Sequence, residues 1–63
     1  MRHWLIAIRK NKGLSQAEVA KRANISQSYY AEIETGARGK GMKVPIAKAI
    51  ADVLEFEWTR FYE

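Results

Sequence analysis

The sequence predicts an all-α fold whose centre is a helix-turn-helix, two short helices joined by a tight turn. Three observations support this fold class. Residues 13–36, GLSQAEVAKRANISQSYYAEIETG, carry two helix-start signals with one short amphipathic segment between them. Apolar residues before and after this stretch recur at the spacing of a helix face. The chain has 63 residues and no cysteine, so one small domain, 1–63, must be held together by packing.

A first helix is expected over residues 2–12. Its apolar stripe consists of Trp4, Leu5 and Ile8. Three basic residues follow near its C-terminal end, Arg9, Lys10 and Lys12. Such cations complement the helix dipole, which explains the two lysines at least as well as a phosphate contact does. Gly13 ends the helix, and Leu14 is expected to fill the corner before the next one.

A second helix begins at Ser15. The Ser15 hydroxyl and the Glu18 carboxylate can each accept a backbone N–H of the first turn, the reciprocal arrangement called a capping box. The apolar face of this helix consists of Val19, Ala20 and Ala23. Asn24 tolerates the left-handed backbone that ends a helix, and only Ile25 separates it from Ser26, the next N-cap. The chain therefore turns sharply, as a helix-turn-helix requires.

The third helix is expected over residues 26–35. Tyr30 and Ile33 lie three residues apart and face inward. The outward surface is shared by Gln27, Ser28, Ala31 and Glu32. Gly36 ends the helix in the left-handed position. This helix therefore presents polar side chains that are suited to the edges of nucleobases.

Residues 35–43, TGARGKGMK, are expected to form a basic surface loop, because three glycines and three cations disfavour a buried regular element. Such a loop is either a featureless linker or a phosphate contact, and it lacks the spacing of a nucleotide-binding loop. A fourth helix begins at Val44 and Pro45, since proline is accepted in a first turn. Its apolar stripe consists of Ile46, Ala47, Ile50, Ala51 and Leu54.

Four aromatic residues then follow within seven positions, Phe56, Trp58, Phe61 and Tyr62. One terminal turn of so small a domain is not expected to bury all four. They either close the core of a monomer against Trp4 and Leu5 or pair across the interface of a dimer.

Composition and charge exclude several classes of function. With no cysteine, one histidine and no carboxylate pair at a catalytic spacing, neither an enzyme nor a metal, cofactor or small-molecule site is expected. No apolar run is long enough to span a membrane and no signal core follows Met1, which favours a cytoplasmic protein. The net charge is +4, with +6 in residues 1–43 and −2 in residues 44–63. This asymmetry favours a polyanion at the N-terminal portion.

Together these segments resemble the phage Cro and CI repressors and their XRE-type bacterial relatives. The residues that carry the resemblance are Leu5, Ile8, Arg9, Gly13 to Gln16, Glu18 to Ala20, Ile25, Ser26, Ile33, Glu34 and Gly36. Residues 47–51 with Phe56, Trp58 and Phe61 are similar to the fourth and fifth helices of that family. The resemblance implies a compact five-helix, lambda-repressor-like DNA-binding domain. The glycine-rich residues 37–41 depart from many relatives in this family.

The resemblance also implies which residues contact DNA. A recognition helix presents its first two turns to base edges in the major groove. The base-contacting residues are Gln27, Ser28 and Glu32, whose side chains suit adenine, several bases and cytosine, respectively. Tyr29 either joins them or packs against the protein. Gln16 matches a family position that bonds a phosphate; helix geometry and charge add Arg9, Ser26, Thr35, Arg38, Lys40 and Lys43.

The expected function is that of a sequence-specific transcriptional regulator, most simply a repressor, that binds double-stranded DNA in the cytoplasm and is held at the nucleoid when bound. Two copies on a palindromic operator combine base and phosphate contacts into a useful affinity. Since the last helix builds the dimer in the related repressors, a homodimer is expected through Phe56, Trp58, Phe61 and Tyr62. The alternative is a protein-interaction module on the same fold, such as an antitoxin or an anti-repressor partner, docking through these aromatics.

Overall fold

The computed structural model describes residues 1–36 and 42–63. These residues form α1 (His3–Asn11), α2 (Gln16–Ala23), α3 (Gln27–Thr35), α4 (Val44–Leu54) and the 3-10 helix η1 (Trp58–Tyr62). The all-α fold class is confirmed, but the count of five α-helices is not. The last element has only five residues and is wound as a 3-10 helix, a form that proteins use in short pieces.

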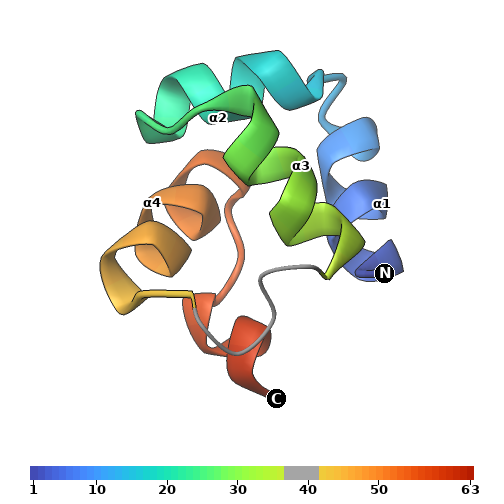
Figure 1. Ribbon diagram of the computed structural model, residues 1–63. Coiled ribbons are helices and arrows are strands. Elements are labelled where there is room, and N and C mark those ends of the chain that lie inside the picture. Colours follow the sequence, from blue (N-terminus) through green and yellow to red (C-terminus); the bar gives the residue numbers. More distant parts are fainter. Residues whose placement is uncertain (37–41) are drawn as a thin grey trace.

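The helices surround one core (Figure 1). Figure 1 shows α2 across one end of the molecule and η1 at the opposite end, with α1 and α4 on either side of α3. Contacts join α2 to both α3 and α4, η1 to α4, and α1 to α3. The N-terminus lies beside the C-terminal end of α3, where the Arg2 N–H donates to the Glu34 carbonyl at 2.8 Å.

The predicted signals at the helix ends are confirmed. Ser15 Oγ accepts the Glu18 N–H at 3.1 Å, and the Ser15 N–H donates to the Glu18 carboxylate at 3.0 Å, which lowers the pKa of Glu18. Asn24 ends α2 at φ 60°, in the left-handed region. Ser26, two residues later, caps the next helix, because its Oγ accepts the Tyr29 N–H at 3.1 Å. The turn between α2 and α3 is therefore specified by local chemistry at each side.

The core draws on all five elements. Its buried members are Leu5, Val19, Ala20, Ala23, Tyr30, Ile33, Met42, Ala47, Ile50, Leu54 and Phe61. Trp4 and Phe56 pack against them, and their ring centroids lie 5.4 Å from that of Phe61 and 5.2 Å from each other. The first and last elements are therefore joined through aromatic rings, as the closed-monomer alternative requires of Trp4, Phe56 and Phe61.

Asn24 tests the left-handed end of α2. Asn24→Ala is expected to lower the free energy of unfolding by about 1 kcal/mol, because an alanine Cβ is strained at this backbone conformation and offers no local hydrogen bond. Asn24→Gly removes the strain and is expected to be neutral or stabilising. Urea unfolding followed by tryptophan fluorescence measures both variants. Equal losses in the two would show that the asparagine side chain, and not the backbone conformation, matters here.

Candidate nucleic-acid interface

The outward face of α3 carries the predicted base-reading side chains. Gln27 and Ser28 are exposed in the first turn, and Glu32 is partly exposed one turn later. The opposite face is fixed in the core, because Tyr30 and Ile33 are fully buried. The helix therefore presents an amide and a hydroxyl to the surroundings from a rigid base, which is the geometry that direct readout of a groove needs.

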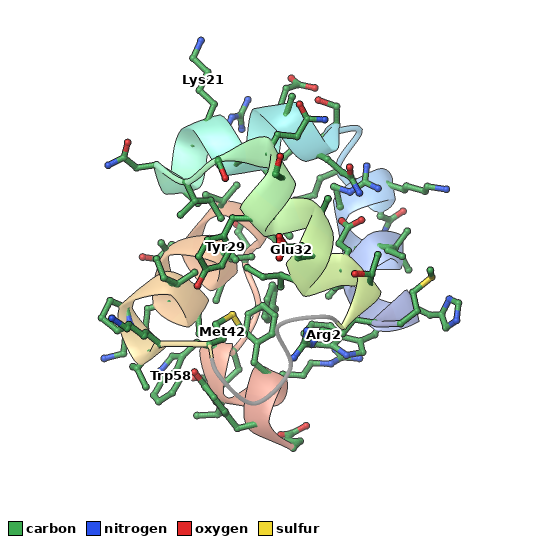
Figure 2. All side chains as sticks on the ribbon, viewed as in Figure 1. Arg2, Lys21, Tyr29, Glu32, Met42 and Trp58 are labelled. Atoms are coloured by element: carbon green, nitrogen blue, oxygen red, sulfur yellow. The ribbon has the colours of Figure 1, made fainter. Side chains whose placement is uncertain are left out.

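The sequence allowed Tyr29 two roles, a contact with a base or packing against the protein. Its side chain is partly buried and packs against the core cluster. Figure 2 shows Tyr29 on the side of α3 that faces α4, while Glu32 lies at the front of α3. The packing role of Tyr29 is therefore present in the structure, and a contact with a base stays a prediction.

A buried carboxylate lies behind this face. Glu34 is only 2% exposed, yet Arg9 of α1 donates to it through Nε at 2.6 Å and through Nη2 at 3.3 Å. Gln16 of α2 donates to the same group through Nε2 at 2.9 Å. Burial alone raises the pKa of a carboxyl, but these hydrogen bonds outweigh it and hold the pKa of Glu34 below its ordinary value. Glu34 is therefore charged, and it joins three helices.

Two predicted phosphate contacts thus have partners inside the protein. Arg9 uses Nη1 as well, donating to the Leu14 carbonyl at 3.0 Å, so its guanidinium is bound within the fold. Gln16 donates one hydrogen of its side-chain amide to Glu34, and the second hydrogen of that amide is left for another acceptor. The role of Glu34 itself was not predicted. A glutamate beside Ile33 on the inward face is the signal that could have shown it, because a buried acid needs a cationic partner.

The other predicted phosphate contacts are spread along the edge of α3 and the start of α4. The hydroxyl of Ser26 caps α3, and Thr35 Oγ1 donates to the Glu32 carbonyl at 3.0 Å. Both side chains are exposed, as is Lys43, the residue that precedes α4. Arg38 and Lys40 lie outside the described residues.

A family model described as helix-turn-helix matches residues 5–61. The chain belongs to the helix-turn-helix family. It is also similar to an uncharacterized HTH-type transcriptional regulator, YqaF, of Bacillus subtilis (strain 168), with 46% identity over 63 residues that cover all of this chain and 80% of that protein. No solved structure matches it significantly. The XRE-type resemblance inferred from the sequence is confirmed, and this family is a class of DNA-binding domains, not a class of enzymes.

Several cations of this helix-turn-helix protein are engaged within the fold. Lys12 forms an ion pair with Glu55, which lowers the pKa of that carboxyl. Lys48 Nζ lies 5.2 Å from the centroid of the Trp58 ring, and the Arg60 guanidinium lies 4.5 Å from that of Trp4. From the net charge alone, these basic groups would be expected to face solvent or a polyanion, but in the structure they contact aromatic rings.

Exposed cations lie on α2. Lys21 and Arg22 are exposed in its last turn, and Figure 2 shows Lys21 extending away from the body of the molecule. With Glu18 they line a surface hollow. In residues 1–36 and 42–63, no three histidine, aspartate or glutamate side chains gather where they could hold a metal ion. None of the helices described is long and apolar enough to cross a bilayer.

The C-terminal aromatics differ in how far they are buried. Phe61 is 7% exposed and lies in the core, so it does not offer surface to a second copy, whereas Phe56 packs against the core and stays partly exposed. Tyr62 is 44% exposed, and its ring centroid lies 6.0 Å from that of the half-buried Trp58. Tyr62 also donates its hydroxyl to the Met42 carbonyl at 2.9 Å, which fixes η1 against the start of α4. Phe56, Trp58 and Tyr62 are therefore the C-terminal aromatics that reach the surface.

The charged state of Glu34 makes the stability of the domain depend on pH. Because folding lowers the pKa of Glu34, its contribution is present above the unfolded-state pKa of about 4.3 and is lost as pH falls through the lower folded-state value. Gln16→Ala removes one donor to this carboxylate. Gln16→Ala is therefore expected to lower the free energy of unfolding by more at pH 7 than near pH 2. Urea unfolding at both pH values measures it, and an equal difference at both would contradict this account.

Proposed function

We propose that this helix-turn-helix protein is a sequence-specific regulator of transcription that binds double-stranded DNA, most simply as a repressor. The observation that carries the proposal is the exposure of Gln27 and Ser28 on a helix whose opposite face is locked in the core. The name of the 46% identical Bacillus relative, a transcriptional regulator, supports the same function. A protein that binds operators works in the cytoplasm and is held at the nucleoid when bound.

Base reading is assigned to the first two turns of α3. Gln27 bonds bidentately to N6 and N7 of adenine, and Ser28 donates to or accepts from several bases. The Glu32 carboxylate only accepts, so it favours the amino group of cytosine and is repelled by positions that present acceptors. Tyr29 packs beside them and reaches a thymine methyl group with its ring edge. These side chains provide sequence information at adjacent base pairs.

Phosphate contacts position α3 in the groove. Gln16 offers its second amide hydrogen at the N-terminus of α2, where the helix dipole also favours an anion. Ser26 caps the start of α3 and Thr35 is its last residue, and Lys43 adds a charge at the start of α4. We add Arg38 and Lys40 from the sequence alone. Arg9 orients α3 through Glu34, to which its Nε and Nη2 donate, and the N–H groups left over are available to a phosphate.

A second copy is proposed to join the first on DNA. Of the four predicted dimer residues, the three with exposed surface are Phe56, Trp58 and Tyr62, of which Tyr62 is 44% exposed. Three residues make a small patch in comparison with the 1,000 Å² or more that a stable interface commonly buries. DNA is therefore needed to hold the pair together, on a palindrome whose half-sites lie about one helical turn apart.

Duplexes selected from a random library test the function. Gln27→Ala is expected to lower the ratio of specific to random affinity by about tenfold, because one base contact contributes roughly 1 to 3 kcal/mol of discrimination. Lys43→Ala serves as the control, since losing a phosphate contact weakens all sequences alike and reduces the salt slope by about one. Equal losses on both duplexes for Gln27→Ala would remove its base-reading role. Undetectable binding at low salt would instead favour a protein-interaction module.

The dimer surface is tested on full and half operators. Tyr62→Ala is expected to leave affinity for a half-site duplex unchanged and to lower affinity for the palindromic duplex by about tenfold, since only the pair uses this contact. Thr59→Ala, an exposed neighbour on η1, is the matched control. Electrophoretic mobility titrations measure both, with thermal unfolding to verify folding. Unchanged cooperativity in Tyr62→Ala would place the dimer contact elsewhere.

A further inference from the structure

The residue before α1 is attached to the far end of the recognition helix. Arg2 donates its backbone N–H to the Glu34 carbonyl at 2.8 Å and its Nη1 to the Ile33 carbonyl at 2.6 Å. Both acceptors lie in the last turn of α3. We propose that Arg2 is a positioning residue that fixes this last turn, and thereby sets how strictly Glu32 discriminates between bases. The proposal rests on the DNA-binding function proposed above.

The composition of α3 explains why it needs such a cap. The last carbonyls of a helix have no partner within the helix, and their partial negative charge favours nearby cations. The last turns of α1 and α2 carry their own basic residues, whereas that of α3 carries none. Instead α3 places Glu32 and Glu34 near its C-terminal end, where carboxylates are unfavourable. Arg9 neutralises Glu34, and Arg2 supplies a second cation directly at the carbonyls.

The other side of the Arg2 guanidinium rests on the C-terminal element. Its Cζ atom lies 5.4 Å from the centroid of the Phe61 ring. Phe61 belongs to the core and packs at a tilt against Trp4, so the ring offers a rigid platform. Figure 2 shows Arg2 between the end of α3 and η1. The Arg2 side chain therefore holds the last turn of α3 against η1.

The two ends of α3 are held by different groups. The first turn, with Gln27 and Ser28, is fixed by the Ser26 cap and the tight turn from α2. Arg2 contacts neither of them through the hydrogen bonds described. Glu32, by contrast, shares its turn with the carbonyls that Arg2 binds, and its own carbonyl accepts the Gly36 N–H at 3.0 Å. Loss of Arg2 is thus expected to loosen Glu32 and to spare the first turn.

The experiment compares discrimination at two base pairs of the selected operator. Gln27→Ala and Glu32→Ala first identify the base pair that each side chain reads, as the position whose discrimination disappears. Arg2→Ala is then expected to lower discrimination about fivefold at the Glu32 position and by less than twofold at the Gln27 position. Arg2→Lys, which retains the charge near the carbonyls, is expected to restore part of the loss.

Arg60→Ala is the matched control, because it removes the same charge and a cation–π contact to the same aromatic cluster but no hydrogen bond to α3. It is expected to leave both positions unchanged. Equal loss at both positions in Arg2→Ala, or the same result in Arg60→Ala, overturns the positioning role.

Amide hydrogen exchange separates a failure of this proposal from a failure of the proposed function. In Arg2→Ala, the Gly36 amide is expected to exchange at least about fivefold faster than in wild type, because the turn that it closes frays. Wild type that discriminates between no duplexes refutes the regulator function, and the exchange result still decides whether Arg2 holds the helix end. Unchanged exchange overturns the cap.

Discussion

The buried carboxylate of Glu34 is the constraint on which the orientation of α3, the proposed recognition helix, depends. A charged group that is 2% exposed is stable only while its hydrogen-bond donors stay in place, and those donors come from α1 and from the first residue of α2. Removing one partner of a buried pair costs roughly 3 to 5 kcal/mol, a large part of the stability of a small domain. The three N-terminal helices therefore cannot shift independently, and the outward face of α3 keeps its direction.

Basic side chains also stabilise contacts between helices elsewhere in the molecule. Arg2 and Arg60 lie over aromatic rings that join α1 to η1, and Lys12 pairs with Glu55 at the end of α4. The net charge of +4 consequently overstates what faces a polyanion. Under the proposed function, phosphates are left to exposed cations such as Lys43, and the base contacts of α3 take a correspondingly larger share of recognition.

Local signals in the sequence were enough to predict α1 to α4, but not the contacts between them. The capping box of Ser15 and the left-handed Asn24 involve only neighbouring residues, so a short segment of sequence is enough to predict them. The Arg9–Glu34 pair spans 25 residues, and nothing local says which cation reaches the carboxylate. The same limit explains why Phe61 was assigned to a dimer surface. Aromatic composition predicts apolar burial, whereas the packing of three helices decides which ring is covered.

Under the proposed function, Gln16 couples the stability of the fold to recognition of DNA. One hydrogen of its amide is used on Glu34, which fixes the start of α2 to α3, and the second is available to a phosphate. A phosphate bound there would be placed by the same carboxylate that orients the base-reading face. The distance from the DNA backbone to Gln27 and Ser28 is then set inside the protein, before any base is contacted. Because Glu34 fixes the positions of both Gln16 and α3, a shift of α2 against α3 would misplace the phosphate contact and the base contacts together.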